Sequence, residues 1–539
     1  MRVRLTVLSL LALALGCASP AGQVEPQAPH YSLSVRVLPA ERRLEVSGTV
    51  RIPASNIPRE DLRLALAARV SELQASIIEP AGSAGPAPVE RVSDPADRVE
   101  GERGNATWVV RPGRAIPAET PVTLRFSYVA DGKAAFISYV GPEVAFATGW
   151  GDYWYPVVEG IGGMGTGELT VEAPSGWKVF TDPPQQKPTH FTFAAGPYTV
   201  VERAGPVPLK AWLLSPRAHI DGYLAGVSTM MDTLSAEFGP YPFAELTLIE
   251  VPRSIAKKAG FNAFSPAGFL VLNSRAFDVP EVKYLLEWLG HELSHQWFPH
   301  AVIWDPPGFL YMEEALAEYG GMRVVEEIAG PEAARRLRTS GYEYDPIYSA
   351  EAYFRQVGSG EDQPLAEMKS GIAQRNLAYN KGALMFDMLS REVGRAKFRE
   401  ILHGITRDRR LDVITWRQFR DAVASGTGRD LDWFFAQWLD RAGAPDFQLS
   451  WQPEGDAVRG TITQSAPYYR AHLTIQVRGP GGERDTRVVE IAGASVDFSI
   501  APGFSAAEVL LDPDYEVLRW TPEYRAIAEG AQAARTPSR

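Results

Sequence analysis

The spacing of apolar residues changes twice along this chain. From about residue 31 to residue 201, short runs such as SLSVRVL and VTLRFSYV alternate apolar with polar residues, which predicts antiparallel β-strands. From about residue 206 to residue 444 long helical patterns dominate, and from residue 447 to residue 520 the alternation returns. Because 539 residues are too many for one ordinary domain, we expect each stretch to fold as its own unit.

The predicted fold class is therefore multidomain α+β. An N-terminal antiparallel β domain is expected over residues 30–205, a mainly α-helical domain over 206–446 and a C-terminal β-sandwich over 447–520. The middle domain contains three strand-like runs, LKAWLLS, ELTLIEVP and GFLVLN, and five predicted helices, at 219–238, 281–297, 310–329, 374–393 and 432–442. We expect residues 521–539 to form a frayed tail.

The first residues resemble an export signal. Two arginines precede an apolar run at 5–15 that is too short to span a bilayer, so residues 1–16 are predicted to be a signal peptide. The only cysteine, Cys17, follows directly, as in bacterial lipoproteins, whose cysteine carries the lipid; residues 17–29 would then be a tether to the membrane. This predicts a periplasmic or outer-membrane-anchored lipoprotein. The alternative is ordinary cleavage after the run ALA, which would release a soluble secreted protein.

The charge distribution argues against nucleic acid as a partner. The net charge is −11, the acidic residues are spread along the chain, and no basic stripe is present. The run GIGGMG at 160–165 matches G-x-G-x-x-G, but the strand-like ELTVEAP follows it, where a dinucleotide site needs a helix. We therefore expect neither nucleic acid nor a dinucleotide, and the sequence carries no signal for an oligomeric state.

The stretch GHELSHQWFPH holds three of the chain's eight histidines. His291 and His295 are four residues apart in a helical pattern, so both imidazoles lie on one face and can reach one ion. Glu292 is rotated by about a third of a turn, beside the ion, where it can take a proton from a water molecule. His300 lies off this face and is not an expected ligand. This H-E-x-x-H pattern predicts a zinc site, which needs a third protein ligand and an open fourth position.

The run YMEEALAEY, in the next predicted helix, offers the third ligand. Glu314 and Glu318 share a helix face, whereas Glu313 points about a hundred degrees away. Glu314 lies nineteen positions after His295, which leaves room for a turn at DPPG and an antiparallel return. We therefore predict that Glu314 is the third ligand and that Glu318 accepts a hydrogen bond from the free N–H of His291. The alternative is a pair of solvated helices with surface histidines.

These motifs resemble the aminopeptidase N and leukotriene hydrolase family of gluzincin zinc metallopeptidases. The family shows HE-x-x-HQWFG and W-x-N-E-G-F-A-E-Y, and the runs EFGPYPFAELTLIEVP, AYNKGALMFDML and LDWFFAQWLDRAGAPDF extend the similarity. The resemblance implies a thermolysin-like catalytic domain at 206–446 and one Zn²⁺ per chain, bound by His291, His295 and Glu314. It also implies that Glu292 is the general base and that Tyr379, in AYNKG, donates a hydrogen bond to the oxyanion.

The chain departs from the family where the substrate's amino terminus is read. The family places a glutamate in G-x-M-E-N, whereas this chain has AGFNAFSPAG, without a carboxylate between residues 250 and 278. The expected substrate-binding residues in this segment are Asn262, Ala263, Phe264 and Ser265. A second family carboxylate, from the β domain, has no match at FATGWGDYWYP, although Glu143 and Asp152 are near in sequence. An ammonium buried without an anion costs several kcal/mol, roughly, so the usual anchoring of a free amine is in question.

The expected function is a zinc metallopeptidase that hydrolyses peptides, with aminopeptidase activity as the simplest reading of the resemblance. One alternative is an endopeptidase, or an epoxide or ester hydrolase, that uses the same zinc site without anchoring an amine. Another is a non-catalytic peptide-binding protein on the same fold. The presence of the whole HELSH motif, Glu314 and Tyr379 favours an enzyme, because drift without catalysis would damage one of them.

Overall fold

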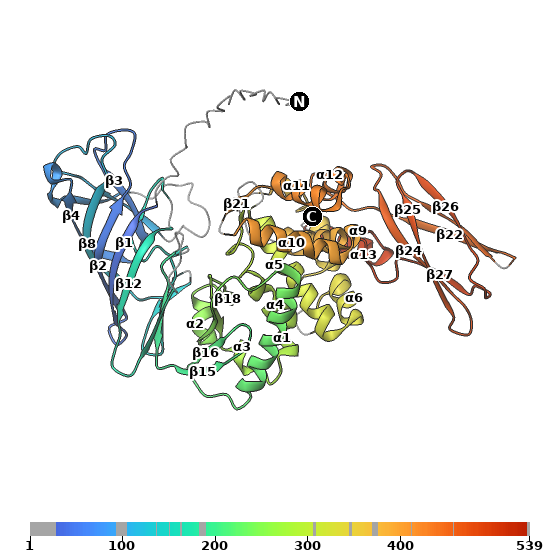
Figure 1. The fold of residues 1–539 in the computed structure, drawn as a ribbon, viewed down its shortest axis with the longest axis horizontal. Coiled ribbons are helices and arrows are strands. Elements are labelled where there is room, and N and C mark those ends of the chain that lie inside the picture. The colour runs from blue at the N-terminus through green and yellow to red at the C-terminus, as the bar shows by residue number, and fades with distance from the viewer. Residues whose placement is uncertain are drawn as a thin grey trace, which may run out of the picture.

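Three bodies follow one another along the long axis of the molecule, a β-rich N-terminal body, a helical centre and a C-terminal pair of sheets (Figure 1). This computed structural model describes residues 28–92, 105–135, 137–149, 151–161, 164–182, 190–304, 309–343, 348–368, 376–410, 412–455 and 457–535. The predicted multidomain α+β class is therefore confirmed. The predicted signal peptide with Cys17, and the DPPG turn at 305–308, lie outside the described residues.

The N-terminal body is built on a six-stranded sheet in the order β12-β1-β2-β8-β4-β5. Its strands are β1 (His30–Leu38), β2 (Arg43–Ile52), β4 (Val70–Glu79), β5 (Gly85–Ala87), β8 (Val122–Asp131) and β12 (Thr166–Glu172). Every second residue of β1 is buried, as the alternating pattern predicts. The body is antiparallel as predicted except at one pair, where β12 joins the free edge of β1 in parallel. Gly167 permits the contact, since a Cβ there would lie 1.8 Å from the Tyr31 carbonyl oxygen.

Two smaller sheets complete this body. One has the order β13-β14-β10-β9 and the other β11-β3-β7-β6. Their strands are β3 (Leu62–Ala67), β6 (Val89–Val92), β7 (Asn105–Val110), β9 (Ser138–Val140), β10 (Ala145–Ala147), β11 (Val157–Val158), β13 (Lys178–Thr181) and β14 (Phe193–Gly196). The glycine-rich run at 160–165 is followed by strand β12 and not by a helix, and its Gly162 and Gly163 lie outside the described residues.

The sheet of the central body positions the substrate segment. Its order is β15-β16-β17-β19-β18, with bounds Thr199–Arg203, Leu209–Leu213, Leu246–Val251, Phe269–Asn273 and Ala263–Phe264. The strands β16, β17 and β19 are parallel, and every residue of β17 and β19 is buried, as expected for apolar runs covered on both faces. β15, which precedes residue 206, pairs with β16. The short strand β18, with Ala263 and Phe264, runs antiparallel along the edge.

Helices pack around this sheet. The predictions at 219–238 and 310–329 match α1 (Ile220–Phe238) and α5 (Phe309–Ala329). The prediction at 374–393 matches the structure over its described part, in which residues 376–377 are helical and lead into a π-helical turn η5 (Ala378–Gly382) and α9 (Ala383–Val393). The predictions at 281–297 and 432–442 are too long, because the structure has η3 (Val282–Leu285) with α4 (Leu286–Ser294), and α12 (Asp432–Trp438). Unpredicted elements are α2 (Arg253–Lys258), α3 (Arg275–Asp278), α6 (Pro331–Ser340), α7 (Ala350–Gly358), η4 (Leu365–Glu367), α10 (Arg395–Asp408), α11 (Trp416–Thr427) and the bridge β20–β21. None of the helices in the described part of the chain has the length and hydropathy to cross a membrane.

The C-terminal body is the predicted small β-sandwich. One sheet has the order β22-β23-β26 and the other β25-β24-β27. The strands are β22 (Gln448–Glu454), β23 (Ala457–Thr463), β24 (Ala471–Arg478), β25 (Arg484–Ile491), β26 (Ser495–Ile500) and β27 (Glu508–Leu511). Their inward side chains, among them Ile462, Leu473, Ile475 and Ile500, belong to the same continuous apolar core as the central body.

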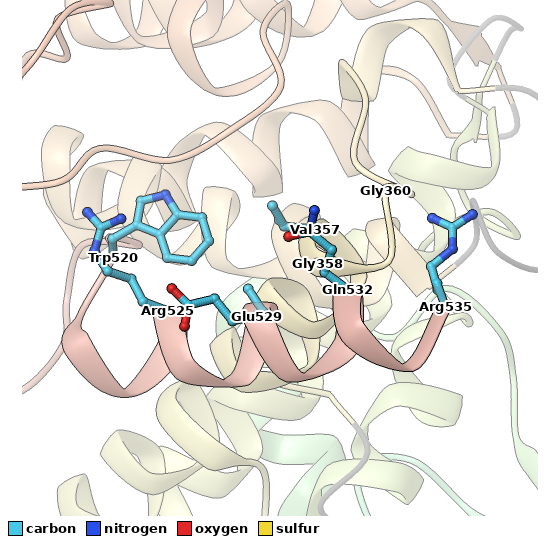
Figure 2. A pocket seen from close by; sticks show the side chains of 9 residues that line it. Val357, Gly358, Gly360, Trp520, Arg525, Glu529, Gln532 and Arg535 are labelled. Atoms are coloured by element: carbon cyan, nitrogen blue, oxygen red, sulfur yellow. The ribbon is translucent and has the colours of Figure 1, made fainter. Parts of the chain in front are cut away.

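The expected frayed tail at 521–539 is wrong for its described part. Residues Pro522–Arg535 form helix α13, which lies along α7. Tyr524 is buried in the shared core and its ring stacks on Phe354 of α7. Gly358 lets the helices touch, because a Cβ there would lie 2.1 Å from the Ala528 carbonyl oxygen. Beyond this contact the helices bound an open pocket of about 550 Å³, with Trp520 at one end and Arg535 at the other (Figure 2).

Candidate metal centre

The two helices that carry the predicted ligands cross at glycines. A Cβ on Gly321 of α5 would lie 2.8 Å from the Glu287 carbonyl oxygen of α4, and one on Gly290 would lie 3.1 Å from the Cα of Gly321. The helix axes therefore approach more closely than side chains of ordinary size would allow. This close crossing places the face of α4 with the histidines opposite the face of α5 with Glu314 and Glu318.

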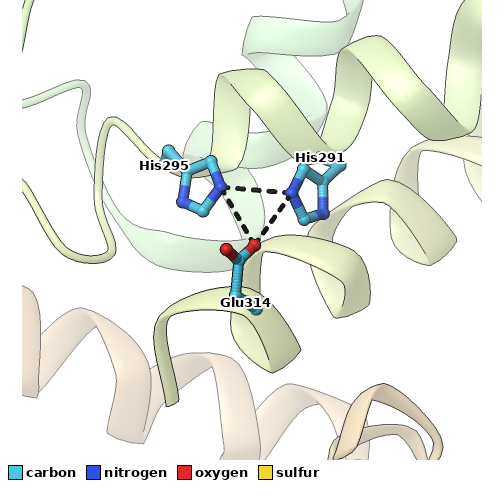
Figure 3. A group of neighbouring side chains, drawn as sticks. All are labelled: His291, His295 and Glu314. Atoms are coloured by element: carbon cyan, nitrogen blue, oxygen red, sulfur yellow. Dashed lines mark hydrogen bonds and ion pairs between the residues drawn. The ribbon is translucent and has the colours of Figure 1, made fainter. Parts of the chain in front are cut away.

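Three side chains converge where the helices cross (Figure 3). The Nε2 atoms of His291 and His295 are 3.1 Å apart, and they lie 3.4 Å and 3.6 Å from Oε2 of Glu314. All three residues are buried. Bonds of about 2.0–2.1 Å at tetrahedral angles would hold ligand atoms about 3.3 Å apart, so the separations and the donor set fit Zn²⁺. It is the one group of this kind among the described residues.

The other nitrogen of each imidazole has a partner that fixes the ring. The Nδ1 of His291 lies 3.1 Å from Oε2 of Glu318, which is the contact predicted for that glutamate. The Nδ1 of His295 lies 2.9 Å from the carbonyl oxygen of Phe298. His295 follows the last residue of α4 but keeps right-handed helical backbone angles, so it still shares a face with His291. With both Nδ1 atoms donating, both Nε2 atoms are free to act as metal ligands.

Glu292 lies beside this group and is held by a contact that the sequence did not reveal. The hydroxyl of Ser265 donates a hydrogen bond to Oε2 of Glu292, and Ser265 is buried. The Nε2 of His300 donates to the carbonyl oxygen of the same serine. Gln296 adds two bonds, from its Nε2 to the Pro266 carbonyl oxygen at 2.8 Å and from the Gly268 N–H to its Oε1 at 2.7 Å. The segment 265–268 is therefore fastened to the helix of the H-E-x-x-H motif.

Tyr379 lies on the π-helical turn η5, beside the histidines. Its ring centroid is 5.3 Å from that of His291, and the ring is half-buried. A second tyrosine, Tyr348, stacks on it with centroids 4.3 Å apart and planes 20° apart. Sequence reasoning missed Tyr348, because nothing in its neighbourhood distinguishes it from the other nineteen tyrosines.

Comparison with known proteins agrees with this geometry. Residues 226–438, which include both crossing helices and η5, match the family described as the peptidase family M1 domain. The central part of the chain is therefore similar to the M1 peptidase family. It is 23% identical to "Probable aminopeptidase 1" of Sulfurisphaera tokodaii over 49% of this chain and 34% of that protein. It is also 23% identical to "Aminopeptidase N" of Streptomyces lividans over 65% of this chain and 43% of that protein.

A solved structure shares the fold of this chain. The crystal structure of Legionella pneumophila aminopeptidase A in complex with aspartic acid superposes with a TM-score of 0.64 and 12% sequence identity. The match covers 94% of this chain and 61% of that protein. The chain thus spans less than half of either curated relative, and under two thirds of the solved structure's chain.

The buried charges of this site depend on one another. Burial alone would lower the pKa of His291, but hydrogen bonds with Glu314 and Glu318 outweigh it and raise that pKa well above its ordinary value. Burial alone would raise the pKa of Glu314, but its bonds to His291 and His295 outweigh it, so that pKa is lowered. Without a cation the group is held together by shared protons. A divalent cation would replace these protons at the same buried atoms.

The predicted substrate-binding residues lie in or beside the edge strand β18, in three different settings. Asn262 is exposed, and its carbonyl oxygen accepts from the backbone and side chain of Asn273. Ala263 and Phe264 are half-buried in β18, and Ser265 bonds the Glu292 carboxylate. Among the described residues, the segment 262–265 thus carries no carboxylate.

The two carboxylates noted near the second family position are engaged elsewhere. Asp152 is buried and pairs with Arg69 at 2.6 Å, and Glu143 accepts from the Tyr139 hydroxyl at 3.1 Å. Glu250, the last carboxylate before the substrate segment, pairs with Arg217 at 2.9 Å. None of these three is placed as a free counter-ion for a substrate ammonium.

Proposed function

We propose that this protein is a zinc-dependent peptidase that hydrolyses peptide bonds. Aminopeptidase activity is the assignment we favour. The observation that carries the proposal is the convergence of His291 Nε2, His295 Nε2 and Glu314 Oε2 at spacings that suit one zinc ion. The names of the curated relatives, both aminopeptidases, support the choice of reaction.

The residues of the chain have distinct parts in such a reaction. A bound Zn²⁺ would polarise the scissile carbonyl and lower the pKa of a water molecule. Glu292, oriented by Ser265, takes the proton of the attacking water and passes it to the departing amine. The phenolic hydroxyl of Tyr379 donates a hydrogen bond to the oxygen on which negative charge develops. Glu318 holds His291 in the tautomer that keeps Nε2 free for the metal.

Two substitutions test the reaction. Glu292→Gln keeps all three ligands and removes the base, so the variant is expected to retain zinc and to lose hydrolysis. His295→Ala removes a ligand and is expected to lose both. Zinc is measured by elemental analysis and hydrolysis on a mixed peptide library. A fully active Glu292→Gln enzyme would refute the mechanism.

A second candidate follows from the edge strand. The segment 262–265 carries no carboxylate, whereas the family that the chain resembles has a glutamate in the corresponding motif. Without an anion to bind a free amino terminus, the protein would be an endopeptidase, or another zinc hydrolase without an amine anchor. Digestion of one library with free and with acetylated amino termini, read by mass spectrometry, separates the two. Cleavage that disappears on acetylation favours the aminopeptidase, and cleavage that persists favours the second candidate.

Two further alternatives predict different results with the same protein. An epoxide or ester hydrolase would turn over lipid-like substrates and leave the peptide library intact. A non-catalytic peptide-binding protein would hold zinc and bind peptides without turnover. Cleavage of peptides by wild type, lost in Glu292→Gln, excludes both as the main function.

The proposed place of action is outside the cytoplasm, with the protein anchored to the membrane through lipidated Cys17. The support is the apolar run at 5–15 followed directly by the chain's only cysteine. Fractionation of cells that express the full chain tests it, with Cys17→Ala as the comparison. Wild type is expected with the membranes and Cys17→Ala in the soluble fraction; equal distributions favour ordinary secretion.

A further inference from the structure

We propose that Tyr348 is a positioning residue for the oxyanion donor, because its ring holds the ring of Tyr379 at the angle needed to donate. The inference rests on the proposed peptidase function and on the donor role of Tyr379. It concerns a residue that lies 31 positions before Tyr379 and outside every motif described above.

Ring contacts restrict how Tyr379 can move. Its ring packs nearly parallel to that of Tyr348, with centroids 4.3 Å apart, and meets the ring of His291 at 48° with centroids 5.3 Å apart. Both tyrosines are half-buried, so each side chain is partly enclosed by its neighbours. A stacked neighbour resists tilting of the ring plane and therefore fixes the direction of the phenolic hydroxyl.

Buried hydrogen bonds join the segments that carry the two tyrosines. The backbone N–H of Ser349 donates to Oδ1 of Asn380 at 3.0 Å, and Nδ2 of Asn380 donates to Oε1 of Gln356 at 2.8 Å. Ser349 also caps α7, because its hydroxyl accepts from the Ala352 N–H. Ser349, Gln356 and Asn380 are all buried. The ring stack is therefore part of a hydrogen-bonded contact between the start of α7 and η5.

The local backbone explains why Tyr379 needs such support. η5 is a π-helical turn, a form that is rare and that interrupts the regular stacking of side chains along a helix. Because the hydrogen bonds of a π-helix join residues five apart, the neighbours that Tyr379 has along the helix differ from those in a regular α-helix. Tyr348 supplies a neighbour from another element.

The phenol of Tyr348 is suited to pack, not to carry charge. Burial raises its pKa, and the carboxylates of Glu318 and Glu287 raise it further, so this phenol stays protonated. A neutral ring adds no negative charge beside the developing oxyanion. The useful part of Tyr348 is thus its aromatic face, and phenylalanine should replace it.

The test is a double-mutant cycle with steady-state kinetics on one peptide. Tyr379→Phe is expected to lower kcat by about 10²-fold, the usual cost of an oxyanion donor. Tyr348→Leu is expected to lower kcat by about 10-fold with little change in KM, since small misplacements of a catalytic group cost rate. Tyr348→Phe is expected to keep kcat within about 3-fold, as the stack survives. The double variant Tyr348→Leu with Tyr379→Phe is expected to be no slower than Tyr379→Phe alone.

A matched control removes an equivalent stack from the far side of α7. Tyr524→Leu breaks the stack on Phe354, so it should lower the melting temperature and leave kcat unchanged. Zinc content should be equal in all variants. Wild-type kcat in Tyr348→Leu, losses that multiply in the double variant, or an effect on KM alone would each overturn the inference and leave the zinc peptidase intact. Full activity of Tyr379→Phe overturns its donor role together with this inference. A wild-type protein that hydrolyses no peptide overturns the proposed function and this inference with it.

Discussion

The hydroxyl of Ser265 makes a direct hydrogen bond to the proposed base, Glu292. It donates to Oε2 of Glu292, while the Ser265 carbonyl oxygen accepts from His300. Burial lowers the pKa of His300 to about 4, so its ring is neutral at physiological pH and adds no charge to the site. The serine thus connects the base to the edge strand without altering the local charge.

Replacement of Ser265 by alanine should slow the reaction without disturbing the metal. A hydrogen bond to a charged group contributes about 1.5–3 kcal/mol, so a kcat lower by roughly 10- to 100-fold is expected. Zinc content and KM should change little, because neither the ligands nor β18 is altered. The control is Ser274→Ala, whose hydroxyl accepts from the Arg253 N–H away from the site. Unchanged kcat in Ser265→Ala would show that the bond does not orient Glu292.

The same residues show what a sequence can reveal at this scale. Helical spacing puts His291 and His295, which are four apart, on one face, and Glu314 follows in the next predicted helix at a distance that allows an antiparallel return, so all three ligands could be predicted. Ser265 reaches Glu292 across 27 positions, through the fold of the edge strand. Tyr348 reaches Tyr379 from the start of α7, a helix that the apolar pattern did not predict. Contacts between residues far apart in the sequence leave no local pattern from which they could be predicted.

At the scale of elements, the crossing of α4 and α5 sets the distance between the ligands. Gly321 has the carbonyl oxygen of Glu287 against its Cα, and Gly320 lies against the Ser294 side chain. The pattern predicted both helices, and α5 matched closely because its period is long and regular. Helix α4 was predicted too long, since its chain turns at residues 295–300 while the apolar pattern continues.

Gly321→Ala should force these helices apart. An alanine Cβ would lie 2.8 Å from backbone oxygen, which cannot move independently of α4. Overpacking of this kind costs about 1–3 kcal/mol of folding free energy. Zinc affinity should fall as well, because Glu314 moves away from the histidines. Gly222→Ala on α1, where nothing lies within 4 Å, is the matched control and should be neutral or stabilising. Equal effects of the two substitutions would show that the crossing is not tight.

Asp387 on α9 makes the central helices sensitive to acid. It is buried and pairs with Arg395 at 3.0 Å and Arg391 at 3.2 Å. Burial alone would raise its pKa, but the arginine charges outweigh it and the folded-state pKa lies below the ordinary 3.8. A carboxylate with a lowered pKa stabilises the fold above its unfolded pKa, and that contribution is lost as the pH falls from about 3.8 toward the folded value.

Asp387→Asn should therefore destabilise the protein by an amount that depends on pH. Near pH 7 the loss of one partner from a buried ion cluster is expected to cost about 3–5 kcal/mol. Below about pH 3 the cost should shrink, since the wild-type carboxyl group is also being protonated. Unfolding in urea at both pH values measures the difference. Asp408→Asn, on an exposed pair with Arg407, serves as the control and should change little at either pH. If Asp387→Asn destabilised the protein equally at both pH values, the lowered pKa assigned to Asp387 in the folded state would be contradicted.

At the scale of the whole molecule, the central and C-terminal bodies share one apolar core. Side chains of the sandwich, of α7 and of α13 all belong to it. The changes in apolar period predicted the order of the three bodies, but they did not predict that two of the bodies share a core. The run EYRAIAEGAQAAR is small and polar enough to suggest a tail, and Tyr524 with Ala528 become buried only because α7 offers Phe354 and Gly358.

Tyr524→Ala should accordingly loosen the attachment of α13 and lower stability. Its ring stacks on Phe354 at 5.0 Å and meets Tyr515 edge-on at 5.4 Å, and its hydroxyl donates to the Thr339 carbonyl oxygen at 3.1 Å. Removal of a buried aromatic ring costs about 3–5 kcal/mol, so we expect a lower melting temperature and faster proteolytic cleavage after residue 520. Tyr468→Ala, which removes an exposed ring from the same C-terminal body, should change neither measurement. Equal melting temperatures for the two variants would mean that α13 contributes nothing to the shared core. Because the metal ligands lie on α4 and α5, zinc content should stay at the wild-type level, which separates loss of this attachment from loss of the site.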